Sequence, residues 1–125
     1  MLSITNSIES DHYRTEVLRI LLNKQSLTDA QFGKLLESCS LMESDHYKTV
    51  VLQEALSSNT MTDAKLASII SATNHIGSDH YITEVLTEAA PKVKSGGAQP
   101  KEAYRAAAKR IDSETYYGRA IRAIE

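Results

Sequence analysis

The sequence SDHYRTEVL, residues 10–18, returns along the chain in almost the same form. Residues 44–52 read SDHYKTVVL, residues 78–86 read SDHYITEVL, and a fainter copy, SETYYGRAI, occupies residues 113–121. Successive copies are 34, 34 and 35 residues apart, and seven of the nine positions are identical in the first three copies. Self-similarity at a fixed period indicates a chain built from repeated structural units.

The repeated motif is typical of the start of a helix. Its serine can accept a hydrogen bond from an unpaired amide of the first turn. The acidic residue that follows places negative charge at the positive end of the helix dipole. Apolar residues then fall on one helical face, at steps of one, three and four residues, rather than alternating as in a strand. We therefore expect four helices that begin at Ser10, Ser44, Ser78 and Ser113.

A second helix is predicted in each complete unit. Thr28 and Gln31 have the spacing of a capping box, and Thr62 repeats the cap without the box. The short links at residues 23–27 and 57–61 suit antiparallel neighbours. An apolar residue stands two positions before each capping serine and is expected to anchor the loop between units: Ile8, Met42, Ile76 and Ile111.

The third unit departs from this pattern. Pro91 is expected to end or kink its first helix, and Gly96-Gly97 to loosen the chain after it. Pro100 suits the first turn of a further helix over about residues 101–110. The predicted fold is all-α, a single solenoid domain of about seven helices. Its units cover about residues 8–41, 42–75 and 76–110, with a half unit at 111–125.

Composition and charge limit the classes of function. The chain has 125 residues, 42% of them hydrophobic, with five glycines, two prolines and one cysteine. It is therefore expected to bury a core and to contain neither an internal disulfide nor a multi-cysteine zinc site. No apolar run is long enough to span a membrane, and the first residues do not read as a secretory signal. A cytoplasmic location is expected, with no membrane partner.

A helical hairpin of about 34 residues matches tetratricopeptide repeats in length, but their Trp, Leu-Gly-Tyr, Ala, Phe and Pro positions are absent. The Ser-Asp-x-Tyr opening followed by Val-Leu resembles HEAT-like repeats of bacterial proteins. Such repeats are appended to membrane-anchored sensor metallopeptidases of the beta-lactam-sensor type. The resemblance covers about residues 8–125 and implies a module that binds or positions another protein. It carries over no peptidase activity, because the chain has no His-Glu-x-x-His motif.

The repeated histidines His12, His46 and His80 raise the question of a metal or pH-sensing row. Equivalent helices of stacked units pack about 8–10 Å apart, whereas Zn–N bonds are about 2.0–2.1 Å. Three imidazoles could not converge on one ion without collapsing the stack. We expect them to bond a neighbouring cap or to face solvent, and we assign no metal ligand and no cofactor.

The repeated tyrosines and the cysteine have an ordinary structural interpretation. Tyr13, Tyr47, Tyr81 and Tyr116 are expected to be core residues with hydroxyls at the edge, and an aromatic ligand groove is the alternative. Cys39 lies on an apolar helix face, where a small buried hydrophobe is expected. No phosphate loop, nucleophile elbow or paired-carboxylate motif is present, so we expect no catalytic residue and no enzyme activity.

The charge is uneven along the chain. Residues 1–90 carry six Lys or Arg against twelve Asp or Glu, a net charge of −6, and residues 91–125 carry eight against four, a net charge of +4. The predicted function is a non-enzymatic protein–protein interaction or scaffolding module. The alternatives are a nucleic-acid-binding module that uses the basic C-terminal third, and a binder of a small ligand or metal along the Tyr/His row.

The end of the chain supplies the candidate interaction surface. The half unit after residue 111 has no second helix, and terminal repeats normally need a polar outer face. We expect either that the chain is part of a longer array or that this end is covered by another molecule. Two-fold pairing of residues 111–125 would give a homodimer, and contact of the basic tail with the acidic front of a neighbouring copy is the alternative. The residues expected to make surface contacts are Tyr104, Tyr117, Arg119 and Arg122.

Overall fold

The computed structural model describes residues 7–23, 27–57 and 62–125, with the side chains of the first helix described from residue 11 onwards. This part of the chain is all-helical and contains no strand. Its elements are α1 (Ser7–Leu22), α2 (Asp29–Ser40), α3 (Asp45–Ser57), α4 (Asp63–Ala72), the short 3-10 helix η2 (Thr73–His75), α5 (Asp79–Lys94), α6 (Ala98–Ala108) and α7 (Glu114–Ala123). The links at 24–26 and 58–61, and the Ile8 and Ser10 side chains, lie outside the described residues.

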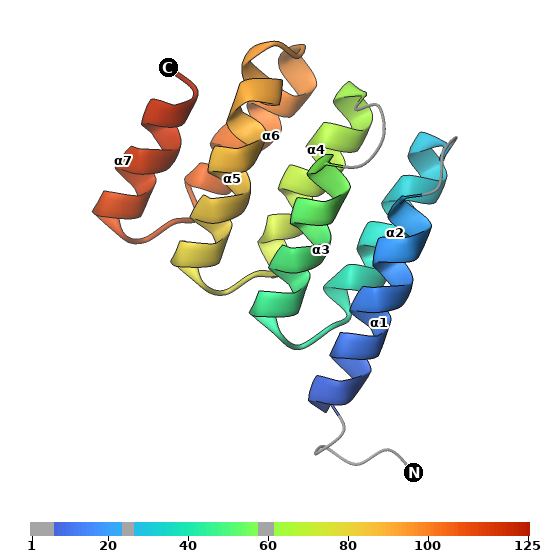
Figure 1. Ribbon diagram of the computed structural model, residues 1–125. Helices are drawn as coiled ribbons and strands as arrows, with labels where there is room; N and C mark the ends of the chain where they lie inside the picture. Colours follow the sequence, from blue (N-terminus) through green and yellow to red (C-terminus); the bar gives the residue numbers. More distant parts are fainter. Residues whose placement is uncertain (1–6, 24–26, 58–61) are drawn as a thin grey trace.

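The helices form two layers. α1, α3, α5 and α7 lie side by side in one layer, and α2, α4 and α6 form the other, behind it in Figure 1. Three helices of the first layer, α1, α3 and α5, also pack on the helix that follows in the chain, so that α1–α2, α3–α4 and α5–α6 are helical hairpins. The three hairpins and α7 follow one another along the molecule in the order of the sequence.

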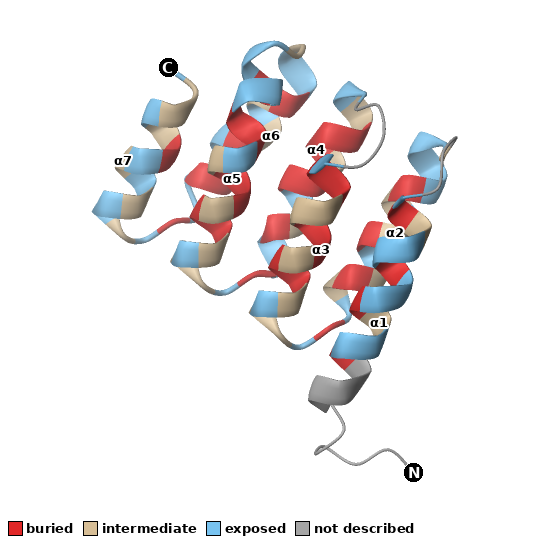
Figure 2. Cartoon of the chain, viewed as in Figure 1, coloured by how far each residue is buried: buried red, intermediate tan, exposed pale blue. Residues whose placement is uncertain are grey.

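The core lies between the layers and between successive hairpins. Figure 2 shows the buried residues on the facing sides of the helices and in the connections that lead into α3, α5 and α7. Those connections carry the predicted loop anchors, and Met42, Ile76 and Ile111 are buried, which confirms the prediction for all three. Burial of this apolar surface is the main favourable contribution to folding.

The predicted helix caps are confirmed in the described units. The hydroxyls of Ser44, Ser78 and Ser113 accept hydrogen bonds from the amides three residues later, at 3.2, 3.4 and 3.4 Å. Thr28 and Gln31 form the complete capping box. Thr62 accepts from the Lys65 amide without the reciprocal bond. Local sequence therefore determines where these helices begin.

A row of aspartates joins each unit to the next, and we call Asp11, Asp45 and Asp79 the aspartate ladder. Asp11 Oδ2 accepts from the amides of Glu43 and Ser44, at 3.0 and 2.8 Å. Asp45 Oδ2 accepts from the Gly77 amide at 3.1 Å. Asp79 Oδ2 accepts from the amides of Asp112 and Ser113, at 3.2 and 3.0 Å. Each aspartate of the ladder thus holds the loop that leads into the following unit.

The first helix begins earlier than predicted. α1 starts at Ser7, so Ser10 lies inside the helix and the expected cap at Ser10 is wrong. In the later units, the preceding aspartate holds the backbone just before the helix in a non-helical loop. No aspartate of the described chain does this for α1, and its helix extends by a turn.

The two prolines also differ from expectation. Pro91 does not end its helix, because α5 continues through it to Lys94. Pro91 stands in the last turn, where it removes one intrahelical hydrogen bond, and the fully buried Val93 anchors that turn. Pro100 lies in the first turn of α6, as predicted, although this helix covers Ala98–Ala108 rather than 101–110.

Candidate functional site

Histidine and tyrosine rings alternate along one edge of the molecule. The ring centroid of Tyr47 lies 5.9 Å from that of His12 and 5.3 Å from that of His46. Tyr81 lies 6.2 Å from His46 and 5.3 Å from His80. The row ends with Tyr116, 5.9 Å from His80. Tyr47, Tyr81 and Tyr116 therefore each lie between two units, where the tyrosine ring contacts the histidine ring of the preceding unit.

This interleaving separates the three histidines from one another. His12, His46 and His80 are exposed, and a tyrosine ring lies between each successive pair. His80 also approaches Glu84, with 3.3 Å between Nε2 and Oε1. Among the described residues, no group of three or more His, Cys, Asp or Glu side chains could hold a metal ion. The row is a set of ring contacts between units.

The prediction that the repeated tyrosines are core residues is wrong for the first of them. Tyr47, Tyr81 and Tyr116 are half-buried and pack against the core. Tyr13 is 72% exposed. The difference has a simple cause, because Tyr47 packs against the unit before it and no described unit precedes Tyr13.

The assignment of Tyr104 to the interaction surface is wrong. Tyr104 is fully buried, and its hydroxyl donates a hydrogen bond of 2.6 Å to the carbonyl oxygen of Ala120. Burial raises the pKa of Tyr104 to about 12, because the phenolate would be desolvated. Tyr104 lies one repeat length after Ile70 and two after Leu36, which are both buried. That spacing was the available sequence signal for a core position.

The other three predicted surface residues are on the exterior of α7. Tyr117 is 40% exposed, and Arg119 and Arg122 are exposed. The guanidinium carbon of Arg119 lies 5.4 Å from the centroid of the Tyr116 ring. Arg119 therefore continues the Tyr/His row, whereas Tyr117 and Arg122 remain available for contact.

A basic cavity lies beside α7. It has a volume of about 260 Å³ and is lined by Val93, Lys94, Lys101, Arg105 and Ile124. Three of the five lining residues are cationic and none is acidic. This cavity favours an anionic ligand at the basic end of the described chain.

Cys39 is buried, as predicted. Burial raises the pKa of its thiol to about 12, an effect that the nearby Lys48 ammonium partly opposes. The thiol donates to the Lys48 carbonyl oxygen at 3.7 Å. Lys48 is itself buried, and its Nζ donates a hydrogen bond of 2.7 Å to the carbonyl oxygen of His75. This bond gives a partner to the last carbonyl group of η2, at the negative end of the helix. Neither group has the environment of a catalytic nucleophile.

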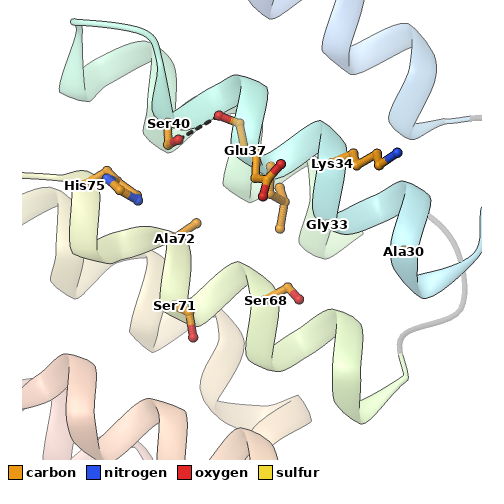
Figure 3. Close-up of a pocket in the computed structure, with 10 residues that line it drawn as sticks. Ala30, Gly33, Lys34, Glu37, Ser40, Ser68, Ser71, Ala72 and His75 are labelled. Atoms are coloured by element: carbon orange, nitrogen blue, oxygen red, sulfur yellow. Dashed lines mark hydrogen bonds between the residues drawn. The ribbon is translucent and has the colours of Figure 1, made fainter.

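A groove opens between α2 and α4. Figure 3 shows Ala30, Gly33, Lys34, Glu37 and Ser40 along one side of it. The opposite side carries small or polar residues of α4 and η2: Ser68, Ser71, Ala72 and His75. Its volume is about 430 Å³, within the range of roughly 300–1,000 Å³ that is usual for ligand sites.

Small side chains create this groove. A Cβ atom added at Gly33 would meet nothing within 4 Å, and Ala30, Ser68 and Ala72 add little volume around it. Sequence reasoning did not identify the groove. Its signal in the sequence was the small residues that share one helical face in α2, at positions 30, 33 and 40, and in α4, at positions 68, 71 and 72.

No protein-family model matches the sequence, and comparisons with curated proteins and with solved structures gave no significant similarity. In the part of the chain that the structure describes, every helix is too short or too polar to cross a bilayer. The function of the groove between α2 and α4 therefore has to be inferred from the residues that line it.

Proposed function

We propose that the chain is an α-solenoid of HEAT-like helical hairpins that acts as a non-enzymatic protein–protein interaction module. The observation that carries this proposal is the open groove between α2 and α4, on the outer side of the second layer. Stacked hairpins typically present extended surfaces of this kind to other proteins.

The chemistry of the groove favours an extended peptide segment. Its serine hydroxyls and the His75 ring can donate to and accept from a peptide backbone. Lys34 and Glu37 give the α2 side both signs of charge, and Ala30, Gly33 and Ala72 leave room for small apolar side chains. Pockets for side chains combined with backbone hydrogen bonds are a common mode of peptide recognition.

The test is affinity capture from an extract of the source organism with three forms of the chain. Gly33→Trp fills the groove with an indole, because open space surrounds the Gly33 Cα. Gly118→Trp is the matched control, since Gly118 is also helical and open but lies on α7, away from the groove. A groove partner is retained by the original chain and by Gly118→Trp and is lost with Gly33→Trp. Equal capture by all three forms would contradict a role for the groove.

A second candidate function is binding of nucleic acid through the basic C-terminal third. It is favoured by the cationic cavity of Lys94, Lys101 and Arg105. Such binding to duplex DNA falls steeply with salt, because it releases condensed counterions. Titration of a labelled duplex at low and moderate salt tests this candidate, and Lys101→Glu should weaken any binding that uses the cavity.

A further inference from the structure

The two ends of the stack differ from its middle in the residues that they leave exposed. On α1, Asp11, Thr15, Leu18 and Leu22 form the buried stripe. The opposite side of the helix carries Tyr13, Val17, Ile20 and Leu21, which we call the leading face. Tyr13 is 72% exposed, Ile20 66% and Val17 37%. Steps of four and three residues place these side chains in one apolar stripe along the helix.

The positions of Val17 and Leu21 are covered in the units that follow, whereas the position of Ile20 carries Glu54 and Glu88, which are not buried. Val17 corresponds to Val51 and Val85, which are fully buried, and to Ala120 of α7, which is also fully buried. Leu21 corresponds to Ala55 and Ala89, again fully buried. These residues are covered because the preceding unit packs on them. The leading face is thus a unit-to-unit interface whose other half is missing from the described chain.

The opposite end carries a matching half, which we call the trailing face: Tyr117, Ile121 and Arg122 of α7. Ile121 corresponds to Leu18, Leu52 and Leu86, all buried beneath the next unit, yet it is only half-buried. Arg122 corresponds to Arg19, whose Nε lies 3.2 Å from Glu54 Oε1 in the next unit. Tyr117 remains 40% exposed.

We infer that a second copy of this chain covers the leading face, with the trailing face of one molecule packed end-on against α1 of the next. Charge supports this occupant, because the part of the chain before residue 91 carries a net charge of −6 and the remainder +4. Glu16 is exposed beside the leading stripe, one turn before the position that corresponds to Glu54. It can therefore receive Arg122 of the neighbouring copy.

The end-on contact is weaker than the contacts inside the chain. α7 has Thr115 and Gly118 where the other units have the ring-stacking histidine and a threonine. A contact between two different faces does not close on itself, so it produces linear oligomers rather than a dimer. In sedimentation equilibrium, the weight-average mass should rise with concentration and pass that of a dimer at high micromolar protein.

Two variants separate this arrangement from two-fold pairing. Val17→Lys disables the leading face, because the corresponding Val51 and Val85 are fully buried, and Arg122→Glu disables the trailing face by setting a carboxylate against Glu16. Both residues are exposed, so both variants should keep the circular dichroism spectrum of the original chain. Each variant alone should be monomeric. An equimolar mixture should form a heterodimer and nothing larger, because it contains one intact face of each kind.

Other outcomes would overturn the inference. A dimer through the C-terminal half unit would survive Val17→Lys, and a dimer through paired α1 helices would survive Arg122→Glu. The original chain remaining monomeric at high micromolar concentration would also overturn it. The charge exchange Glu16→Arg with Arg122→Glu in one chain should restore the oligomers. Gly33→Trp should leave the oligomers unchanged, so that failure here is distinct from failure of the groove proposal.

Discussion

Cys39 is the residue for which burial has the most direct chemical consequence. Its pKa of about 12, in place of 9.0, lowers the thiolate fraction at neutral pH about a thousandfold. We expect a disulfide reagent at pH 8 to label the folded protein far more slowly than the urea-unfolded protein. Absorbance of the released thiol measures both rates. Comparable rates would show that the thiol is accessible in the native state.

Tyr104 should make stability sensitive to alkaline pH. Tyr104→Phe removes the hydrogen bond to the Ala120 carbonyl oxygen and should cost about 1 kcal/mol at pH 8. The pKa of Tyr104 is about 12 in the folded protein and 10.0 for an ordinary tyrosine, so the unfolded chain loses this proton first. Stability is fully present below pH 10 and falls as the pH rises toward 12.

Urea unfolding at two pH values tests this dependence. The variant lacks the titrating hydroxyl, so its deficit relative to the original chain should narrow between pH 8 and pH 11. Cys39 titrates in the same direction in both proteins and does not affect the comparison. A deficit that widens at pH 11 would contradict the burial of Tyr104.

At the scale of elements, the aspartate ladder should contribute according to the bonds that each member accepts. Asp79 accepts two backbone hydrogen bonds and Asp45 one. Asp79→Ala should therefore destabilise the protein by about 2 kcal/mol, and Asp45→Ala by about half as much. Asp79→Asn keeps an acceptor and should cost less than Asp79→Ala. Chemical denaturation of the three variants gives the ranking, which an equal loss in all three would contradict.

Gly33 should respond to substitution in the opposite direction. It lies inside α2, where glycine is unfavourable by about 1 kcal/mol relative to alanine. An added Cβ meets nothing within 4 Å. Gly33→Ala should therefore raise the free energy of unfolding by up to about 1 kcal/mol, and thermal unfolding followed by circular dichroism measures it. A lower melting temperature would mean that the groove beside α2 is narrower than described.

At the scale of the whole molecule, stability should be greatest in the middle of the stack. Each hairpin packs only on its neighbours, so α3 and α5 have partners on both sides within their layer, whereas α1 and α7 have one. Hydrogen exchange followed by mass spectrometry should show the slowest exchange in α3–α5 and faster exchange in α1 and α7. Uniform protection across all helices would indicate a single cooperative unit instead.

How much the sequence could predict depended on the range of the interactions involved. The caps at Ser44 and Thr28 were predictable because the bonds that form them span three residues. The burial of Tyr104 depends on its position in the stack. Tyr104 and Ile70 occupy equivalent positions, but one is aromatic and the other aliphatic, so the sequence did not make this equivalence obvious. The groove depends on the spacing between α2 and α4, which no local pattern records.

The aspartate ladder has a consequence for how a gene of this kind can change in length. Every ladder bond runs from the aspartate of one unit to the backbone that leads into the next, so a 34-residue segment cut just before that backbone carries one half of two equivalent junctions. An in-frame duplication of codons 43–76 would supply a carboxylate to the loop after it and amides to the carboxylate before it. Unequal crossing-over at the Ser-Asp-His-Tyr codons could therefore lengthen or shorten the protein by whole hairpins without leaving a junction unpaired.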